Sequence, residues 1–274
     1  MLHRTTPSSG ETIPAIGIGS WIQFDISAHS SDRKELKDVL SLMHEQGATV
    51  IDSSPMYGRS EQVIGELTHE TGLADQFFYA TKVWTTGRES GIRQMKESMQ
   101  KMRRTTMDLL QIHNLVDWQT HLKTLRQWKD EGIIRYLGIT HYTTSSHSQL
   151  NEIIRKEPLD FVQFNYSIGT RNAERTLLPL AKDKGVAVII NEPLEKGRLF
   201  EQVRGKPLPS WVADYAIDSW AAFFLKYIIS HPAVTCVIPA TSNPGHMKDN
   251  LSAGEGSMPD EAARRKMAKY FDEL

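Results

Sequence analysis

Four side chains of this sequence could take part in one reaction: Asp52, Tyr57, Lys82 and His113. Each stands at or just after the end of a short apolar segment, and the three segments follow one another along the chain. Taken alone, a strand-end aspartate is more often a cap, a lysine a solvated end and a histidine a buried core residue. If the segments are neighbouring parallel strands, however, their carboxyl ends meet at one edge. The four side chains are then expected to converge on a single point.

The residue types indicate a proton donor beside a carbonyl group. A tyrosine hydroxyl titrates near 10, so it is a poor acid at neutral pH unless a neighbour favours its phenolate. The Lys82 ammonium would favour the phenolate, and the Asp52 carboxylate would keep that lysine charged and oriented. His113 would donate a hydrogen bond to a carbonyl oxygen on which negative charge develops. Such a set protonates an alkoxide, so the missing reactant is a hydride.

A metal centre is the main alternative chemistry, and the sequence does not favour it. No His-x-His pair occurs among the ten histidines. Lys82 would repel a cation placed between Asp52 and His113. We therefore expect no metal site.

The elements that must carry these residues alternate regularly. Helical patterns with apolar residues at i, i+3, i+4 and i+7 lie between short apolar segments. Eight such strand–helix units predict an α/β fold, a (β/α)8 TIM barrel whose strands are buried on both faces. A doubly wound sheet is the alternative, but no GxGxxG motif follows the first segment. The eight predicted strands are residues 16–21, 48–54, 77–83, 107–114, 136–142, 161–167, 186–193 and 234–241.

Three further segments complete the predicted architecture, which we interpret as a single domain over residues 1–274. Residues 2–14 predict a β-hairpin that closes the amino-terminal end of the barrel. The long segment 194–218 delays the seventh helix, and loops of this length are usually functional or mobile. Residues 260–274 predict a C-terminal helix.

Composition excludes several classes of protein. The 274 residues carry 32 Lys+Arg and 33 Asp+Glu, a net charge of −1, which argues against a nucleic-acid partner or a polybasic membrane anchor. A single cysteine, Cys236, cannot form an internal disulfide. The amino terminus has no apolar signal-peptide core, and no apolar run is long enough to span a bilayer. We expect a cytoplasmic, monomeric globular protein with no nucleic-acid or membrane partner.

Along nearly its whole length the chain resembles the aldo-keto reductase family, and in particular its bacterial NAD(P)H-dependent carbonyl reductases. The resemblance implies that Tyr57 is the general acid, that Asp52 and Lys82 activate it, and that His113 orients the substrate. The expected reaction is the reduction of aldehydes and ketones to alcohols by hydride transfer. Seven motifs carry the resemblance: GIGSW (17–21), IDSSPMYG (51–58), TKVW (81–84), QIHN (111–114), GITHY (138–142), VQFNYS (162–167) and IPATSNPGHMKDN (238–250).

The substrate pocket is expected to be largely apolar. The resemblance places Trp21 and Trp84 as its aromatic walls, although ordinary core packing is an equal interpretation for Trp84. The loop after the fourth strand offers Leu115, Val116 and Trp118 as an apolar lip suited to hydrophobic or aromatic carbonyls. With Tyr57 and His113, the predicted pocket residues are therefore Trp21, Trp84 and Trp118.

The nicotinamide positions match the family only in part. Where the family has a serine, an asparagine and a glutamine that hold the carboxamide, this chain has Thr140, His141 and Gln163. Where many members stack a tyrosine on the ring, this chain has Asn191. Thr140 and Gln163 can still bind an amide, but the stacking energy must be lost or supplied elsewhere.

The adenosine phosphate end departs further. Asn243 and Pro244 read as the N-cap and first residue of a helix whose free amides could receive a phosphate. The family's lysine and arginine for the 2′-phosphate are replaced by Ala240 and His246, and an imidazole is only partly charged near neutral pH. Lys196 and Arg198 are candidate substitutes. NADPH is the expected cofactor, with a reduced margin over NADH, which is not excluded.

The full set of predicted cofactor-binding residues follows from these positions. It consists of Gly19, Ser20, Trp21, Asp52, Thr140, His141, Gln163, Asn191, Glu192, Pro193, Leu194, Lys196, Arg198, Ile238, Ala240, Thr241, Ser242, Asn243, His246, Asp249 and Asn250. Because Asn191 and the phosphate residues depart from the family, a second hypothesis stays open. In it, the barrel binds the cofactor as a regulatory or redox-sensor protein with little turnover.

Overall fold

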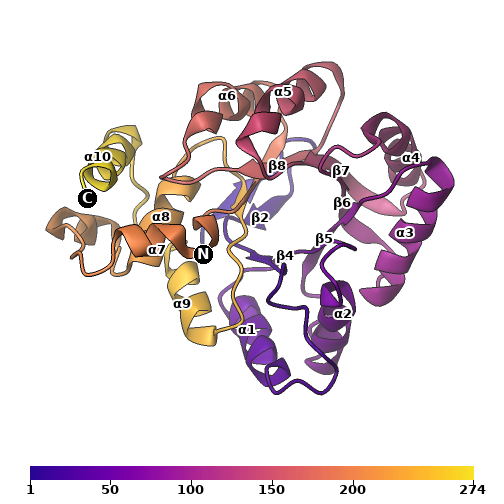
Figure 1. Ribbon diagram of the computed structural model, residues 1–274, viewed down its shortest axis with the longest axis horizontal. Helices are drawn as coiled ribbons and strands as arrows, with labels where there is room; N and C mark the ends of the chain where they lie inside the picture. Colours follow the sequence, from indigo (N-terminus) through magenta and orange to yellow (C-terminus); the bar gives the residue numbers. More distant parts are fainter.

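The computed structural model describes residues 1–274, and its centre is a sheet of eight parallel strands. Each strand pairs with the next one along the chain, and a bridge between Ile16 and Val237 joins the first strand to the last. The sheet therefore closes into the predicted barrel (Figure 1). The strands are β3 (Ile18–Gly19), β4 (Val50–Asp52), β5 (Phe78–Val83), β6 (Met107–His113), β7 (Ile134–Thr140), β8 (Phe161–Asn165), β9 (Ala187–Asn191) and β10 (Cys236–Val237).

Helices surround this barrel, as Figure 1 shows. Each strand is followed by at least one helix, and α1 packs against α9, so the first and last units of the ring meet. The ring helices are α1 (Arg33–Glu45), α2 (Ser60–Glu70), α3 (Arg88–Lys101), α4 (Trp118–Asp130), α5 (His147–Lys156), α6 (Leu177–Asp183), α7 (Arg198–Gln202), α8 (Trp220–Ile229) and α9 (Pro244–Ser252), and α10 (Glu261–Asp272) follows them as the predicted C-terminal helix.

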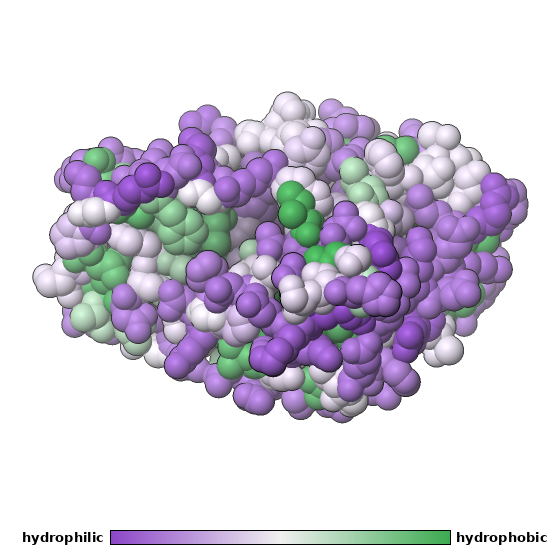
Figure 2. Space-filling model, turned by 60° about the horizontal axis from the view of Figure 1, so that its bottom comes forward, coloured by the Kyte–Doolittle hydropathy of each residue, from purple (hydrophilic) through white to green (hydrophobic).

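The apolar periodicity places each helix on the barrel. In α1, Leu36, Val39, Leu40 and Met43 are all buried, as their i, i+3, i+4, i+7 spacing predicts. Gly47 follows this helix with φ of +73°, the left-handed conformation that ends helices at glycine. Polar residues occupy the outer faces. The surface seen in Figure 2 is accordingly mostly hydrophilic, with hydrophobic side chains gathered in a few patches.

Two hydrophobic cores result from the alternation of side chains along the strands. The larger lies between the strands and the helices, and a smaller one fills the barrel interior. Phe78 and Ala80 of β5 belong to the interior core, and Lys82 continues the same face of that strand. The parity of β5 therefore carries a lysine into the carboxyl end of the barrel.

The predicted hairpin is formed by β1 (His3–Thr5) and β2 (Thr12–Pro14), paired antiparallel. Ile13 of this hairpin belongs to the interior core. The Tyr136 hydroxyl binds Glu11 and Ser9 beside it. The hairpin thus closes the end of the barrel opposite to the carboxyl ends of the strands.

The segment 194–218 contains short helical pieces rather than an extended loop. They are the 3-10 helix η3 (Glu195–Gly197), the helix α7 and the 3-10 helix η4 (Ser210–Tyr215). Two more single turns, η1 (Thr144–Ser146) and η2 (Asn172–Arg175), precede α5 and α6. None of the helices is long and apolar enough to cross a membrane.

Candidate active site

The four predicted catalytic side chains lie together at the carboxyl end of the barrel. Lys82 is fully buried, and its Nζ donates to Asp52 Oδ2 at 2.5 Å and to the carbonyl oxygen of Ser53 at 2.6 Å. The same Nζ lies 5.1 Å from the centre of the Tyr57 ring. The rings of Tyr57 and His113 meet edge to face, with 5.8 Å between their centres. The convergence predicted from strand parity is therefore observed.

A sharp turn directs the chain immediately after Tyr57. Gly58 has φ of +57°, and a Cβ at this position would lie 2.4 Å from the Asp25 carboxylate. Asp25 Oδ1 in turn accepts a hydrogen bond from the Arg59 amide at 2.9 Å. Only glycine fits this turn without a clash. The contact fixes the loop that carries Tyr57 against the loop after β3.

Burial and charge set the protonation of the pair at the base of the site. Burial raises the pKa of Tyr57, and the Lys82 ammonium offsets only part of this rise. Burial alone would lower the pKa of Lys82, but Asp52 and Tyr57 together outweigh burial, so the pKa is raised. Sequence reasoning predicts the correct sign for the effect of Lys82 on Tyr57, but not the larger opposing effect of burial. At neutral pH the tyrosine therefore holds its proton beside a charged lysine.

His113 is a neutral imidazole. Burial, together with the Lys82 charge, lowers its pKa to about 2. Its Nδ1 lies 2.9 Å from Ser54 Oγ, which already accepts a hydrogen bond from the Met56 amide. When the Ser54 hydroxyl donates its hydrogen to Nδ1, the ring proton lies on Nε2. In this tautomer Nε2 is a hydrogen-bond donor without a net charge.

A cavity of about 870 Å³ opens beside these residues. Its size suits a ligand larger than a simple metabolite. Most of the predicted cofactor and pocket residues line it: Gly19, Ser20, Trp21, Asp52, Tyr57, His113, Thr140, Gln163, Asn191, Glu192, Pro193, Leu194, Lys196, Ile238, Ala240, Thr241, His246, Asp249 and Asn250. These residues from β3 to β6 and from β7 to α9 therefore line the same cavity.

Two predicted pocket tryptophans lie outside this cavity, which corrects the expected apolar lip. Trp118 begins α4 and packs partly buried against the larger core. Leu115 is buried in the same core, so of this loop only Asn114 lines the cavity. Trp84 also lies outside it, 42% exposed, with its backbone paired to the Gln94 side chain.

A different set of apolar residues forms the rim. Ile22, Met56, Tyr142 and Phe200 join Trp21 there, each between 38% and 59% exposed. Ile22, Met56 and Tyr142 lie in or next to the motifs of the sequence, so the motifs marked the segments that carry them. Phe200 belongs to the long segment after β9, where no sequence pattern marked it.

Four predicted cofactor residues do not line the cavity: His141, Ser242, Asn243 and Arg198. His141 turns away: its Nδ1 accepts from the Thr143 amide, and its ring stacks on Tyr142. Asn243 caps α9 as predicted, but its Oδ1 already accepts from the amides of Gly245 and His246. Those two amides are therefore not free for a phosphate. Ser242, next to Asn243, is likewise absent from the lining.

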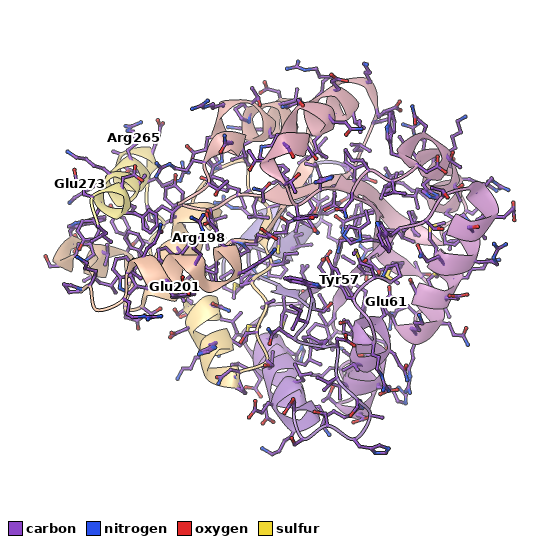
Figure 3. All side chains as sticks on the ribbon, in the orientation of Figure 1. Tyr57, Glu61, Arg198, Glu201, Arg265 and Glu273 are labelled. Atoms are coloured by element: carbon purple, nitrogen blue, oxygen red, sulfur yellow. The ribbon has the colours of Figure 1, made fainter.

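The two candidate cations of the segment after β9 differ in position. Lys196 lines the cavity, pairs with Glu192 at 3.1 Å, and lies over the Trp21 ring at 5.1 Å. Arg198 pairs instead with Glu195, which does not line this cavity. Figure 3 shows Arg198 on α7, well apart from Tyr57. Lys196 is therefore the cation that reaches the cavity, and Arg198 is not.

Two cavity-lining residues, Asn114 and Asn191, each have a buried side-chain oxygen without a partner, and that of Asn191 fits a nicotinamide. Asn191 Oδ1 is buried and unpaired, while Asn191 Nδ2 donates to Gln163 Oε1 at 3.3 Å. Thr140 Oγ1 donates to the same Gln163 oxygen at 3.2 Å. A buried acceptor without a donor is unfavourable unless a bound group satisfies it. The amide N–H of a nicotinamide carboxamide would supply that donor.

The fold and the site together define a barrel oxidoreductase, and comparison with known proteins identifies its family. The model of the Aldo/keto reductase family matches residues 15–269. The chain therefore belongs to the aldo/keto reductase family, and we class it as an oxidoreductase enzyme. No group of histidine, cysteine or acidic side chains that could hold a metal ion is present.

Named relatives and solved structures agree with this family. Methylglyoxal reductase YeaE of Escherichia coli (strain K12) is 27% identical over 277 residues, which cover 96% of this chain and 95% of that protein. Aldo-keto reductase YhdN of Bacillus subtilis (strain 168) is 26% identical over 214 residues, covering 73% of this chain but only 64% of that protein. An aldo/keto reductase from Klebsiella pneumoniae in complex with NADP and acetate has a TM-score of 0.83 at 22% identity, covering 99% of this chain and 96% of that one. This last likeness concerns the fold.

Proposed function

We propose that this protein reduces aldehydes and ketones to alcohols, with a reduced nicotinamide cofactor as hydride donor and Tyr57 as general acid. One observation carries the proposal. The buried Asp52–Lys82 ion pair, with Nζ to Oδ2 at 2.5 Å, lies against Tyr57 at the wall of the large cavity. Burial of two charges costs desolvation energy and adds little stability, so a buried ion pair beside a cavity indicates a role in orientation or chemistry.

The residues divide the work on the carbonyl group. A reduced nicotinamide supplies the hydride when it is bound. His113 Nε2–H donates a hydrogen bond to the carbonyl oxygen and orients it without adding charge. Tyr57 holds the proton that this oxygen takes up as it becomes an alkoxide. Lys82 stabilises the negative charge that develops on the phenol oxygen, and Asp52 keeps the lysine charged.

The same cavity supports the cofactor assignment. Asn191 Oδ1 and Thr140 offer polar atoms to the carboxamide, and Lys196 is the one lysine or arginine in the cavity lining that could pair with a phosphate. NADPH is the proposed cofactor, in keeping with the NADP bound to the Klebsiella enzyme. Because Ala240 and His246 offer no permanent charge to a 2′-phosphate, NADH stays an alternative substrate for the same site.

The rim of the cavity indicates the substrate class. Its exposed apolar side chains favour aldehydes with hydrophobic or aromatic substituents. The named activity of YeaE adds methylglyoxal, a small ketoaldehyde, to the candidates. The protein is expected to accept both classes, with a higher kcat/KM for the larger, apolar aldehydes.

Cofactor oxidation with a panel of carbonyl compounds tests the proposal. The purified protein is mixed with NADPH or NADH and with methylglyoxal, aliphatic aldehydes or substituted benzaldehydes, and the loss of reduced cofactor is followed. We expect turnover that Tyr57→Phe abolishes. If every aldehyde fails while NADPH still binds, the regulatory or sensor hypothesis replaces that of a reductase.

A further inference from the structure

The oxygen of Asp52 that does not face Lys82 is held by two glutamine amides. Asp52 Oδ1 accepts from Gln111 Nε2 at 3.0 Å and from Gln163 Nε2 at 2.9 Å. Asp52, Lys82, Gln111 and Gln163 are all essentially buried, none more than 2% exposed. A carboxylate oxygen can only accept, so both amides must turn their nitrogen atoms towards it. We call Gln111 and Gln163 the amide clamp of Asp52.

The clamp is built into the barrel by strand register. Gln111 lies on β6 directly opposite Lys82 of β5, and it precedes His113 on the same face. Gln163 reaches the site from β8 and lies opposite Thr140 of β7. Its Nε2 also lies 3.3 Å from Gln111 Oε1, so the two amides contact each other as well as Asp52.

The two glutamines differ in their access to a ligand. Gln163 lines the cavity, whereas Gln111 does not. Gln111 therefore contacts neither substrate nor cofactor, and its polar atoms are engaged within the clamp. Gln111 nevertheless points into the barrel interior, as Leu109 does two residues earlier on β6, and Leu109 is part of the interior hydrophobic core. An apolar residue would pack there equally well unless the amide serves Asp52.

We infer that Gln111 is a positioning residue for carbonyl reduction: it holds the Asp52 carboxylate in the orientation that keeps Lys82 beside Tyr57. The inference rests on the proposed function. A carboxylate with one oxygen fixed by two donors cannot rotate about its χ2 torsion, so Oδ2 stays on Lys82 Nζ. Without Gln111 only the Gln163 amide holds Oδ1, so the carboxylate is fixed less firmly beside the Lys82 ammonium. Loss of the hydrogen bond from Gln111 to the charged carboxylate is expected to lower kcat by roughly 10- to 100-fold.

Two substitutions separate positioning from packing. Gln111→Leu keeps the volume and removes the donor, so kcat falls at every pH while the NADPH dissociation constant stays close to wild type. Gln111→Glu places a second carboxyl 3.0 Å from Asp52 Oδ1. At high pH the two carboxylates repel, but on acidification they share one proton, which restores a donor to Asp52. The kcat of Gln111→Glu therefore recovers from pH 8 towards pH 6 relative to wild type. Gln100→Glu, the same change at an exposed site of α3, is the matched control and stays at wild-type activity.

A stability measurement tests the clamp without any turnover. The carboxyl group introduced by Gln111→Glu binds its proton more tightly in the folded state, so its stabilising contribution is present at low pH and is lost as pH rises. The Tm of Gln111→Glu is therefore expected to fall between pH 6 and pH 8 more than that of Gln100→Glu. In an Asp52→Asn background this extra fall shrinks, because the repelling carboxylate is gone.

The outcomes distinguish this inference from the proposed function. If Gln111→Leu retains the kcat and pH profile of wild type, or if Asp52→Asn leaves the pH dependence of Gln111→Glu unchanged, the clamp has no positioning role. If the wild type itself turns over no aldehyde, the proposed function fails. The stability measurements then decide alone whether Gln111 and Asp52 are coupled.

Discussion

Replacement of Lys82 by methionine is the most direct test of the charge arrangement around Tyr57. The ammonium lies 5.1 Å from the tyrosine ring. At an effective dielectric constant of about 20, a unit charge placed at the ring centre would interact with the ammonium by about 3 kcal/mol. If this energy is available only as the phenol gives up its proton, its loss slows the reaction by roughly two orders of magnitude. Lys82 does not line the cavity, so the affinity for NADPH is expected to change little.

The same substitution changes the pH dependence and the stability. Lys82 lowers the pKa of Tyr57 against the effect of burial, so without it this pKa rises further and the alkaline decline in rate moves to higher pH. Asp52 loses its counterion in a buried site, at a cost of about 3–5 kcal/mol, which is roughly 6–20 °C in Tm.

Single-turnover reduction rates from pH 6 to pH 11 and thermal unfolding provide the measurements for this variant, with the exposed Lys96→Met as control. The range extends above pH 10 because the pKa of Tyr57 is raised above its ordinary value. A Lys82→Met enzyme with the rate and pH profile of wild type would refute the assignment of Lys82 to Tyr57.

Three further outcomes follow from the site. Tyr57→Phe keeps the aromatic contact with His113 but has no proton to give, so carbonyl reduction should fall by roughly 10²–10⁴-fold or more with NADPH binding retained; near-normal turnover in this variant would assign the acid elsewhere. Because the pKa of His113 is lowered to about 2, the KM for an uncharged aldehyde should not vary between pH 8 and pH 5, and a KM that titrates near neutrality would contradict the neutral imidazole. The preference for NADPH over NADH should be smaller than that of a lysine–arginine site, because each charge-assisted hydrogen bond is worth roughly 1.5–3 kcal/mol. This preference should grow as pH falls, and His246→Ala should remove that growth. A preference that depends on neither pH nor His246 would assign the phosphate to Lys196.

The barrel could be predicted from the sequence because its signals are local and repeated. Each strand buried on both faces reads as a continuous apolar run, and each helix carries one apolar stripe. Except for β7, the observed strands are shorter than the predicted ones, and the two shortest lie at the seam. There β3 and β10 are only two residues long and are joined through the single bridge from Ile16 to Val237. The length of a strand at a seam depends on its partner across the closure, which lies at the other end of the chain.

Strand parity also placed the site residues on β4, β5 and β6, but it could not place the loops. After His113, the backbone of Asn114, Leu115 and Asp117 adopts positive φ angles of 52°, 58° and 45°. This conformation is uncommon for non-glycine residues, and no sequence signal predicts it for leucine. The chain turns so that Leu115 enters the core, and Trp118 follows it away from the cavity. The predicted lip is therefore absent.

A similar local turn separates the two candidate cations. Lys196 itself is left-handed, with φ of 57°, and Gly197 follows with φ of 94°. Their side chains were equivalent in the sequence, two positions apart in a segment without periodicity. The turn between them sends Lys196 towards Trp21 and Arg198 towards Glu195. Charge and spacing could name the candidates, but the backbone conformation selects between them.

Asn191 belongs to one hydrogen-bond network with Asp52 and Lys82, two of the four predicted catalytic residues. Asn191, which stands where many members have an aromatic residue, donates to Gln163 Oε1, and Gln163 Nε2 donates to Asp52. A side chain that lines the cavity is thus two hydrogen bonds from the carboxylate that holds Lys82. An aromatic residue could stack on a ring but could not extend this polar chain. In the proposed site, Asn191 therefore connects the cavity wall to the proposed general acid Tyr57 through Gln163, Asp52 and Lys82.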